Sequence, residues 1–143
     1  MANIVPDSFK TNLLGGVFDF DSSGGSTFKL ALYTSLGNFS TSTTSYSTTN
    51  EVSSSGTSYT AGGNTLTNNG VAVASNVAYV DFADLTFSSV TLSAVGALIY
   101  KATSNEAVLV LDFGGTKTAT NGDFVIQFPT ANSSNAIIRL GDA

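Results

Sequence analysis

The carboxylates are the residues with the most obvious chemical potential. Asp19 and Asp21 stand two apart and would lie on the same side of an extended chain. Glycosidases need two carboxylates several ångströms apart, and Ca²⁺ needs clustered oxygens. The competing interpretation is a strand end whose polar side chains face water before a turn at Gly24-Gly25. We favour the turn, because spacing alone does not make a catalytic pair.

Other reactive groups are missing or lack the required context. The sequence contains no His and no Cys, which excludes the common zinc sites and the Ser-His-Asp and Cys-His catalytic sets. No Gly-Gly pair opens a helix after a strand or precedes Gly-Lys-Ser/Thr, so these pairs predict turns rather than phosphate loops. Asp81, Asp84 and Asp112 flank strand ends and predict turn and cap residues. We therefore expect a protein that is not an enzyme and has no cofactor and no metal.

The charge content points to assembly. Only 10% of the 143 residues are charged, against roughly 25% in an average soluble domain. A surface with so little charge is a liability for a free monomer, so we expect much of it to be buried against neighbours. The net charge is −5 and the five basic residues are scattered. Neither nucleic acid nor an anionic membrane is an expected partner.

The chain start and the apolar runs bear on location. MANIVPDSFK has no basic region followed by an apolar stretch, so it does not predict a signal peptide. The runs AVGALIY and AVLVLDF are too short to cross a bilayer. We expect a protein that is made in a cytoplasm and remains there or leaves as part of an assembled particle.

One helix is expected, near the N-terminus. Pro6 suits a first turn, and Asp7 or Ser8 can cap the first amide groups. Gly15-Gly16 is a stop signal. The helix is about two turns long, too short to be stable alone, so it must dock on another surface. Its apolar stripe consists of Phe9, Leu13 and Leu14.

The rest of the chain has the rhythm of short strands. Strand signals occur in VFDF, TFKLALYT, NTLTNNGVAVA, NVAYVDFADLTF, TLSAVGALIYKA, EAVLVLDF, DFVIQFPT and AIIRL. TLSAVGALIYKA and EAVLVLDF are apolar on both faces, which is typical of central strands. Asn69-Gly70, Gly114-Gly115 and Asn121-Gly122 predict turns between strands. The pattern predicts an all-β fold, an antiparallel jelly-roll-like β-sandwich with one short N-terminal helix.

Residues 40–63, STSTTSYSTTNEVSSSGTSYTAGG, form a Ser/Thr-rich segment. A linker would leave an independent domain on each side, but only about two strands and a short helix precede this segment, too little for a core. We therefore expect a single domain over residues 1–143, with residues 1–16 as an N-terminal arm and helix. The segment is a long excursion from that domain, anchored by Tyr46, Glu51 and Tyr59, and part of it is a candidate edge strand.

Tyrosines in this region allow two interpretations. Tyr46, Tyr59 and Tyr79 could form an aromatic platform for a sugar. Tyrosine is also a common anchor of protein interfaces and sheet surfaces. We favour packing, because no Trp accompanies the tyrosines.

Several segments, spread over nearly the whole chain, are informative when they are taken as one set. They are TFKLALYTS, Tyr46 with NEV, GTSYTAGGNTL, AYVDFADLTF, GALIY, VLDFGGTKTATNGDFVIQFPT and NAIIRL. This set resembles a group of small virion proteins of tailed bacteriophages. The most specific parts are Glu51 to Gly63 and the ending FVIQFPT with NAIIRL. The serine-rich spacer SSSGTSY is longer than is usual for the group.

The resemblance implies a structural protein of the virion with no catalytic residues. Within the group the chain is most like a capsid decoration (cement) protein, a homotrimer that bridges major capsid protein subunits on the head exterior. It would be assembled in the host cytoplasm. A tail or baseplate component and a carbohydrate-binding adhesin module are the alternatives. The candidate capsid or subunit contacts are Ile4, Phe9, Leu13, Leu14, Tyr46, Glu51 and Tyr59.

Overall fold

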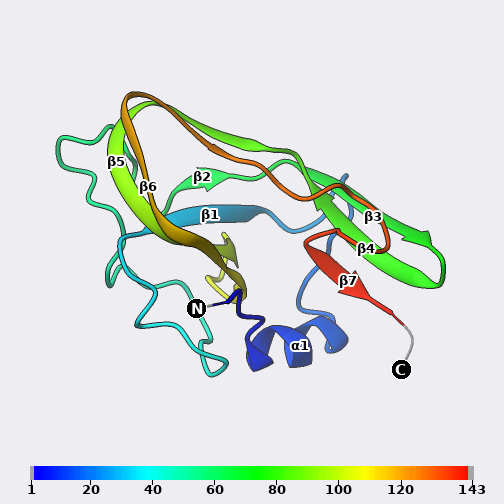
Figure 1. The fold of residues 1–143 in the computed structure, drawn as a ribbon. Helices are drawn as coiled ribbons and strands as arrows, with labels where there is room; N and C mark the ends of the chain where they lie inside the picture. The colour runs from blue at the N-terminus through cyan, green and yellow to red at the C-terminus, as the bar shows by residue number, and fades with distance from the viewer. Residues whose placement is uncertain (1, 142–143) are drawn as a thin grey trace.

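The protein is an all-β sandwich with one short helix. The computed structural model describes residues 2–141. Its elements are α1 (Asp7–Leu14), β1 (Phe28–Tyr33), β2 (Asn64–Thr65), β3 (Asn68–Ala74), β4 (Val77–Phe82), β5 (Leu85–Lys101), β6 (Ala107–Ile126) and β7 (Ile138–Leu140). They form two antiparallel sheets, with strand orders β2-β1-β5-β6 and β3-β4-β7 (Figure 1). The predicted all-β sandwich with one N-terminal helix is confirmed.

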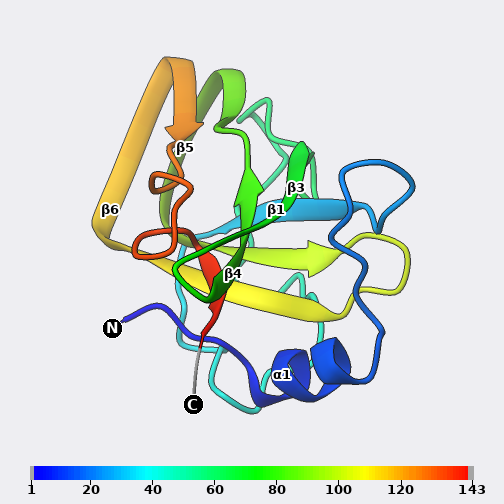
Figure 2. The same ribbon diagram turned by 90° about the vertical axis from the view of Figure 1, so that its right-hand side faces the viewer.

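A long ribbon of β5 and β6 dominates the fold. The two strands pair from Leu85–Ile126 at one end to Tyr100–Ala107 at the other. The ribbon curves strongly, so that its two halves lie on opposite sides of the core (Figures 1 and 2). The pairing shifts register between Ala94 and Gly96, where β6 carries extra residues. Such bulges bend a strand without ending it.

Because of these bulges, two of the turns that the sequence predicted do not reverse the chain. Gly114-Gly115 and Asn121-Gly122 lie inside β6, and Gly114, Gly115 and Asn121 all have positive φ. A bulge uses the same left-handed backbone conformations as a tight turn. The dipeptides therefore mark the bend of the ribbon rather than a chain reversal.

The hairpin of β3 and β4 contains a third misassigned turn. Asn69-Gly70 forms a bulge within β3, where the pairing with β4 shifts between Asn68 and Gly70. The chain reverses at Ser75-Asn76, with φ of 50° and 63°. Two successive positive φ values are typical of the turn that suits a twisted hairpin.

The main core lies between the two sheets. It is rich in phenylalanine, and the rings of Phe20 and Phe28 stack at 4.7 Å. VFDF, predicted to be a strand, is irregular, although Phe18 and Phe20 are buried in this core. On β6 and the segment after it, Phe124, Ile126 and Phe128 are buried, as their alternation predicted.

A second, smaller core covers the opposite face of the four-stranded sheet. It is built from Tyr33, Leu36, Phe39 and Tyr100 together with smaller residues of β1, β5 and β6. The middle of this sheet is therefore buried on both faces, as the apolar sequences of β5 and β6 predicted. The cover on this face comes from loops rather than from another sheet.

Helix α1 forms where the sequence predicted it, but its predicted cap was wrong. Neither Asp7 nor Ser8 caps the helix, which begins after Pro6. The Asp7 carboxylate pairs with Lys10 at 2.9 Å, and the Ser8 hydroxyl donates to the Thr43 carbonyl at 2.9 Å. The helix start is instead held by the Ser/Thr-rich segment, because the Asp7 amide donates to the Thr41 carbonyl at 2.9 Å.

Candidate functional site

The Ser/Thr-rich segment contains no regular strand, yet it is fixed at several points to the four-stranded sheet. The Val52 amide donates to the Leu32 carbonyl of β1 at 2.9 Å, and the Ala107 amide of β6 donates to the Thr44 carbonyl at 3.0 Å. The expected edge strand does not form; the segment makes only isolated β-bridges, such as the one between Tyr33 and Glu51. The segment crosses the sheet face as a set of loops (cyan to teal in Figure 1).

The Glu51 carboxylate is the centre of a hydrogen-bond network within this segment. Its Oε1 atom accepts from the Tyr59 hydroxyl at 2.7 Å and from the Gly62 amide at 2.6 Å. Its Oε2 atom accepts from the Tyr46 hydroxyl at 2.7 Å. Hydrogen bonds to a charged acceptor are roughly twice as strong as neutral ones. One carboxylate thus ties together both halves of the segment.

Tyrosines extend this network into the sheet. The Tyr59 hydroxyl also accepts from the Leu32 amide of β1 at 3.0 Å. The Tyr100 hydroxyl of β5 donates to the Gly62 carbonyl at 2.7 Å, and its ring stacks on Tyr46 at 4.6 Å. The Tyr33 hydroxyl donates to the Ser47 carbonyl at 2.7 Å. We call Tyr33, Tyr46, Glu51, Tyr59 and Tyr100 the tyrosine–glutamate cluster.

The glycines after Tyr59 permit this close approach. Gly63 has φ of 76°, and a Cβ there would lie 1.8 Å from the Leu30 carbonyl oxygen. Any side chain would therefore collide with the backbone of β1. This explains why glycine occurs at this position: Gly62-Gly63 lets the chain pass close to β1, and it does not form a phosphate-binding loop.

The protonation states follow from the surroundings. Burial, followed by the nearby Glu51 carboxylate, raises the pKa of Tyr100 from 10.0 to about 12. Burial is also the main cause that raises the pKa of Tyr33, Tyr46 and Tyr59, each further than that of Tyr100. All four hydroxyls are protonated at neutral pH and act as donors. The Glu51 carboxylate accepts three hydrogen bonds from its own chain, so it holds the two halves of the segment together.

The sequence predicted three members of the cluster and missed two. Tyr46, Glu51 and Tyr59 do come together, but Tyr59 is only 3% exposed and faces its own chain. Tyr79 lies in β4 of the other sheet, so no platform of three tyrosines forms. Tyr33 and Tyr100 were missed. Their signal was a tyrosine at the end of an apolar strand, whose buried hydroxyl needs a partner.

The carboxylates considered for catalysis or metal binding hold turns and loops. Asp19 Oδ1 accepts from the Asp21 amide at 2.9 Å, so this pair organises its own turn. Asp81 accepts from the Asn69 side chain, and Asp84 accepts from the Phe128 amide, both at 2.8 Å. Within residues 2–141, no group of three or more Asp or Glu residues could hold a metal ion.

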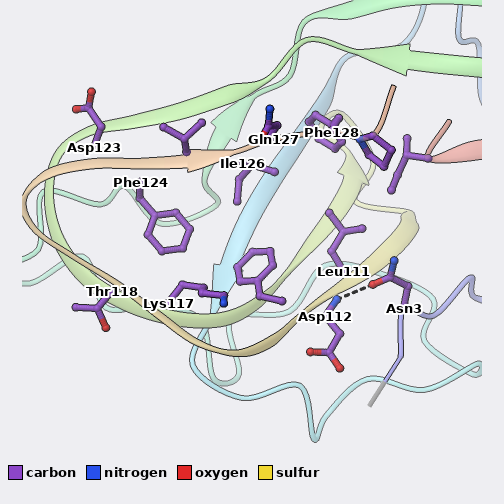
Figure 3. A pocket seen from close by; sticks show the side chains of 14 residues that line it. Asn3, Leu111, Asp112, Lys117, Thr118, Asp123, Phe124, Ile126, Gln127 and Phe128 are labelled. Carbon is purple, nitrogen blue, oxygen red and sulfur yellow. Dashed lines mark hydrogen bonds between the residues drawn. The ribbon is translucent and has the colours of Figure 1, made fainter. Parts of the chain in front are cut away.

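A pocket of about 510 Å³ opens under the curved ribbon (Figure 3). Its apolar wall includes Phe124 and Ile126, and Lys117 and Asp112 lie on its lower side in this view. The Asp112 amide donates to the Asn3 side chain at 2.8 Å, and the Gly114 amide lowers the pKa of the Asp112 carboxyl.

A second hollow, about 590 Å³, is a groove between α1 and β7. Leu14 lines it and is 81% exposed, and Val5 and Leu140 line it with 42% and 59% exposed. Of the predicted contacts in this region, Leu13 is half-buried on the same groove. Phe9 is buried in the main core, and Ile4 bridges to Val110 of β6. The described part of the N-terminal arm therefore docks on its own chain, and Leu14 is more exposed than Val5, the other exposed large apolar residue there.

No helix among the described residues is long and apolar enough to span a membrane. Comparisons with protein-family models, with curated proteins and with solved structures found no match.

Proposed function

We propose that the chain is a structural protein of a tailed-bacteriophage virion, a capsid decoration protein that bridges major capsid protein subunits on the head exterior. The resemblance of its segments to small virion proteins suggested this function. In this proposal the subunits act as homotrimers. Each contact with the capsid needs to contribute only a few kcal/mol, because many copies bind the same lattice.

The observation that carries the proposal is the exposed apolar groove between α1 and β7. In a chain with only 10% charged residues, Val5, Leu14 and Leu140 expose apolar surface around one hollow. Large exposed apolar surface of this kind is typical of protein contacts. The groove offers a capsid subunit an apolar site, and Leu14 is the most exposed of its large apolar residues.

The arrangement of polar groups supports a binding role rather than a catalytic one. The polar groups of the tyrosine–glutamate cluster make their hydrogen bonds to other groups of the same chain. The proposal requires a rigid body with surfaces for neighbours, and this use of Glu51 supplies rigidity.

Quantitative mass spectrometry of purified particles tests the proposal. A decoration protein is expected in hundreds of copies per particle. A handful of copies would favour a tail or baseplate component, and its absence from particles would overturn both assignments.

A binding experiment tests the groove. Particles made without the protein are mixed with purified protein and sedimented. Leu14→Lys is expected to weaken binding at least about tenfold, because a charge would replace the most exposed apolar side chain of the groove. Val125→Lys is the matched control, since Val125 is 55% exposed and lies on β6 outside the groove. Equal binding by both variants would remove the groove from the proposal.

The adhesin alternative receives no support from the tyrosines. Tyr59 is buried, and one face of Tyr46 is covered by Tyr100. A glycan array with the recombinant protein checks this, and we expect no binding at high micromolar concentration.

A further inference from the structure

Strand β3 is an edge strand that the rest of the described chain leaves partly open. It is the first strand in the order β3-β4-β7, and its hairpin projects from the right-hand end of the molecule in Figure 1. The start of β3 is held, because the Asn68 side chain donates to the Phe20 carbonyl at 2.9 Å and Ser22 lies beside Gly70. Beyond this point, from Val71 to Ala74, every residue is exposed.

Beyond its bulge at Asn69-Gly70, this edge lacks the usual protection against pairing. Proteins commonly protect an edge strand with a lysine, a proline, an inward charge or a covering loop. Here no Asp, Glu, Lys, Arg or Pro occurs between Glu51 and Asp81. Val71 is 54% exposed and Val73 is 72% exposed. An uncharged apolar edge of this kind is a template for another strand.

The exposed valines continue the inner face of the sheet. Val71 is opposite Val80 and Val73 is opposite Ala78, and residues opposite each other share a face. Val80 is 6% exposed and belongs to the main core. The Val71–Val73 stripe is therefore an extension of the core surface beyond the body of the protein.

We infer that β3 pairs antiparallel with β3 of a second copy of this chain, about a twofold axis at Ala72. The sequence Val71-Ala72-Val73 is symmetric about its centre, so Val71 lies opposite the partner's Val73, and Val73 lies opposite the partner's Val71. All four valines then share one face. A centre at Val73 would instead place Val71 opposite a serine, so Ala72 is the centre that buries the most apolar surface.

The charge distribution permits the same pairing. Each copy carries a net charge of −5, so two copies repel each other over most orientations. The β3 edge lets them approach with no like charges opposed, and the small Gly70 and Ala74 flank the valine pairs. The contact is isologous and closes after two copies. It does not depend on the proposed virion function.

Light scattering over a concentration series tests the inference. Wild-type protein is expected to approach twice the mass of Val73→Lys, whose dissociation constant should rise at least about tenfold. Each lysine would replace an apolar contact with the partner's Val71, and both charges would lie on the same face of the joined sheet. Val125→Lys is the matched control and should behave as wild type. A wild-type mass equal to that of Val73→Lys at the highest concentration would overturn the inference, as would an equal loss in Val125→Lys.

Disulfide trapping tests the register, using the absence of native cysteine. In the proposed pairing the two Ala72 Cα atoms lie about 5 Å apart, within disulfide reach. The two Ala74 Cα atoms lie roughly 14 Å apart, beyond that reach. Mild oxidation should give a covalent dimer of Ala72→Cys and not of Ala74→Cys. Cross-linking of both variants, or of neither, would contradict the twofold at Ala72.

Discussion

Regular secondary structure is usually the better anchored part of a fold, but two regions of this protein, residues 40–63 and the β3–β4 hairpin, show the opposite. Residues 40–63 contain no regular strand, yet Val52 is 4% exposed and the Glu51 carboxylate accepts three hydrogen bonds. The β3–β4 hairpin has a regular ladder, yet Val71 and Val73 are more than half exposed. Contacts with the rest of the fold, rather than a repeating backbone pattern, hold a segment in place.

The physical difference lies in where each region finds its partners. The Ser/Thr-rich segment satisfies backbone groups on the sheet, as in the Val52–Leu32 bond, and uses short Ser turns between these points. In the hairpin, β3 pairs only with β4, and its outer edge is open beyond Gly70. Losing one anchor should therefore affect the first region strongly and the second only slightly.

Gly63→Ala is expected to have the largest effect. A Cβ at this position collides with the Leu30 carbonyl, and the positive φ adds strain. We expect the free energy of unfolding to fall by about 3 kcal/mol or more. Chemical denaturation measures it. Gly56→Ala is the control, because φ is 73° there but nothing lies within 4 Å of the added Cβ. It should cost about 1 kcal/mol, and equal losses would show that the close approach is unimportant.

Glu51→Gln comes next. Glutamine removes the charge and places an amide donor among groups that already donate. We expect a loss of about 2 kcal/mol in the free energy of unfolding, since hydrogen bonds to charged groups contribute about 1.5–3 kcal/mol. Glu106→Gln, in the loop between β5 and β6 where Glu106 accepts from Ser104, should change stability by less than about 0.5 kcal/mol. A neutral Glu51→Gln would mean that the cluster does not anchor the segment.

The same substitution, valine to alanine, compares the Ser/Thr-rich segment with the β3–β4 hairpin directly. Val52→Ala removes buried methyl groups from the Ser/Thr-rich segment and should cost about 2 kcal/mol. Val73→Ala, at 72% exposed, should cost less than about 0.5 kcal/mol in the stability of the isolated chain. Thermal or chemical denaturation at low protein concentration measures both. A larger loss for Val73→Ala would reverse the comparison.

The pH dependence of stability should be the smallest effect, because it is absent near neutral pH and develops only at high pH. The pKa of Tyr100 is raised from 10.0 to about 12 in the folded chain, so above pH 10 the unfolded chain releases this proton first. The stabilising contribution is complete below pH 10 and is lost as pH rises towards 12. Stability measured against pH should be flat to about pH 9 and then fall. Tyr100→Phe should reduce that fall by about 1 kcal/mol at pH 11. An identical profile of stability against pH in Tyr100→Phe would show that Tyr100 does not contribute to the fall.

The sequence predicted the sandwich and the helix because alternation and stop signals act locally. The alternation of Phe124, Ile126 and Phe128 and the position of Gly15 needed no tertiary information. Asn69-Gly70 and Gly114-Gly115 misled because positive φ serves a bulge as well as a turn. Only the strand partners, unknown from the sequence, decide between the two.

The candidate site was predictable only in part. Tyr46, Glu51 and Tyr59 were conspicuous as the large or charged residues in a Ser/Thr-rich stretch. Their partners Tyr33 and Tyr100 lie in other strands, and nothing local pairs them with Glu51. The burial of Phe9 and the bridge from Ile4 to β6 likewise depend on how the arm folds back, which the sequence pattern does not encode.

Hydrogen exchange of wild type and Glu51→Gln most directly tests whether Glu51 anchors residues 40–63. The Val52 amide is bonded to the Leu32 carbonyl, and the Gly62 amide is bonded to the Glu51 carboxylate. Both should exchange as slowly in wild type as the amides of β1, and Glu51→Gln should selectively speed exchange at Gly62. Exchange at Gly62 that is equally slow in both proteins would contradict this account, as would exchange at Val52 and Gly62 at the rate of an unfolded chain in wild type.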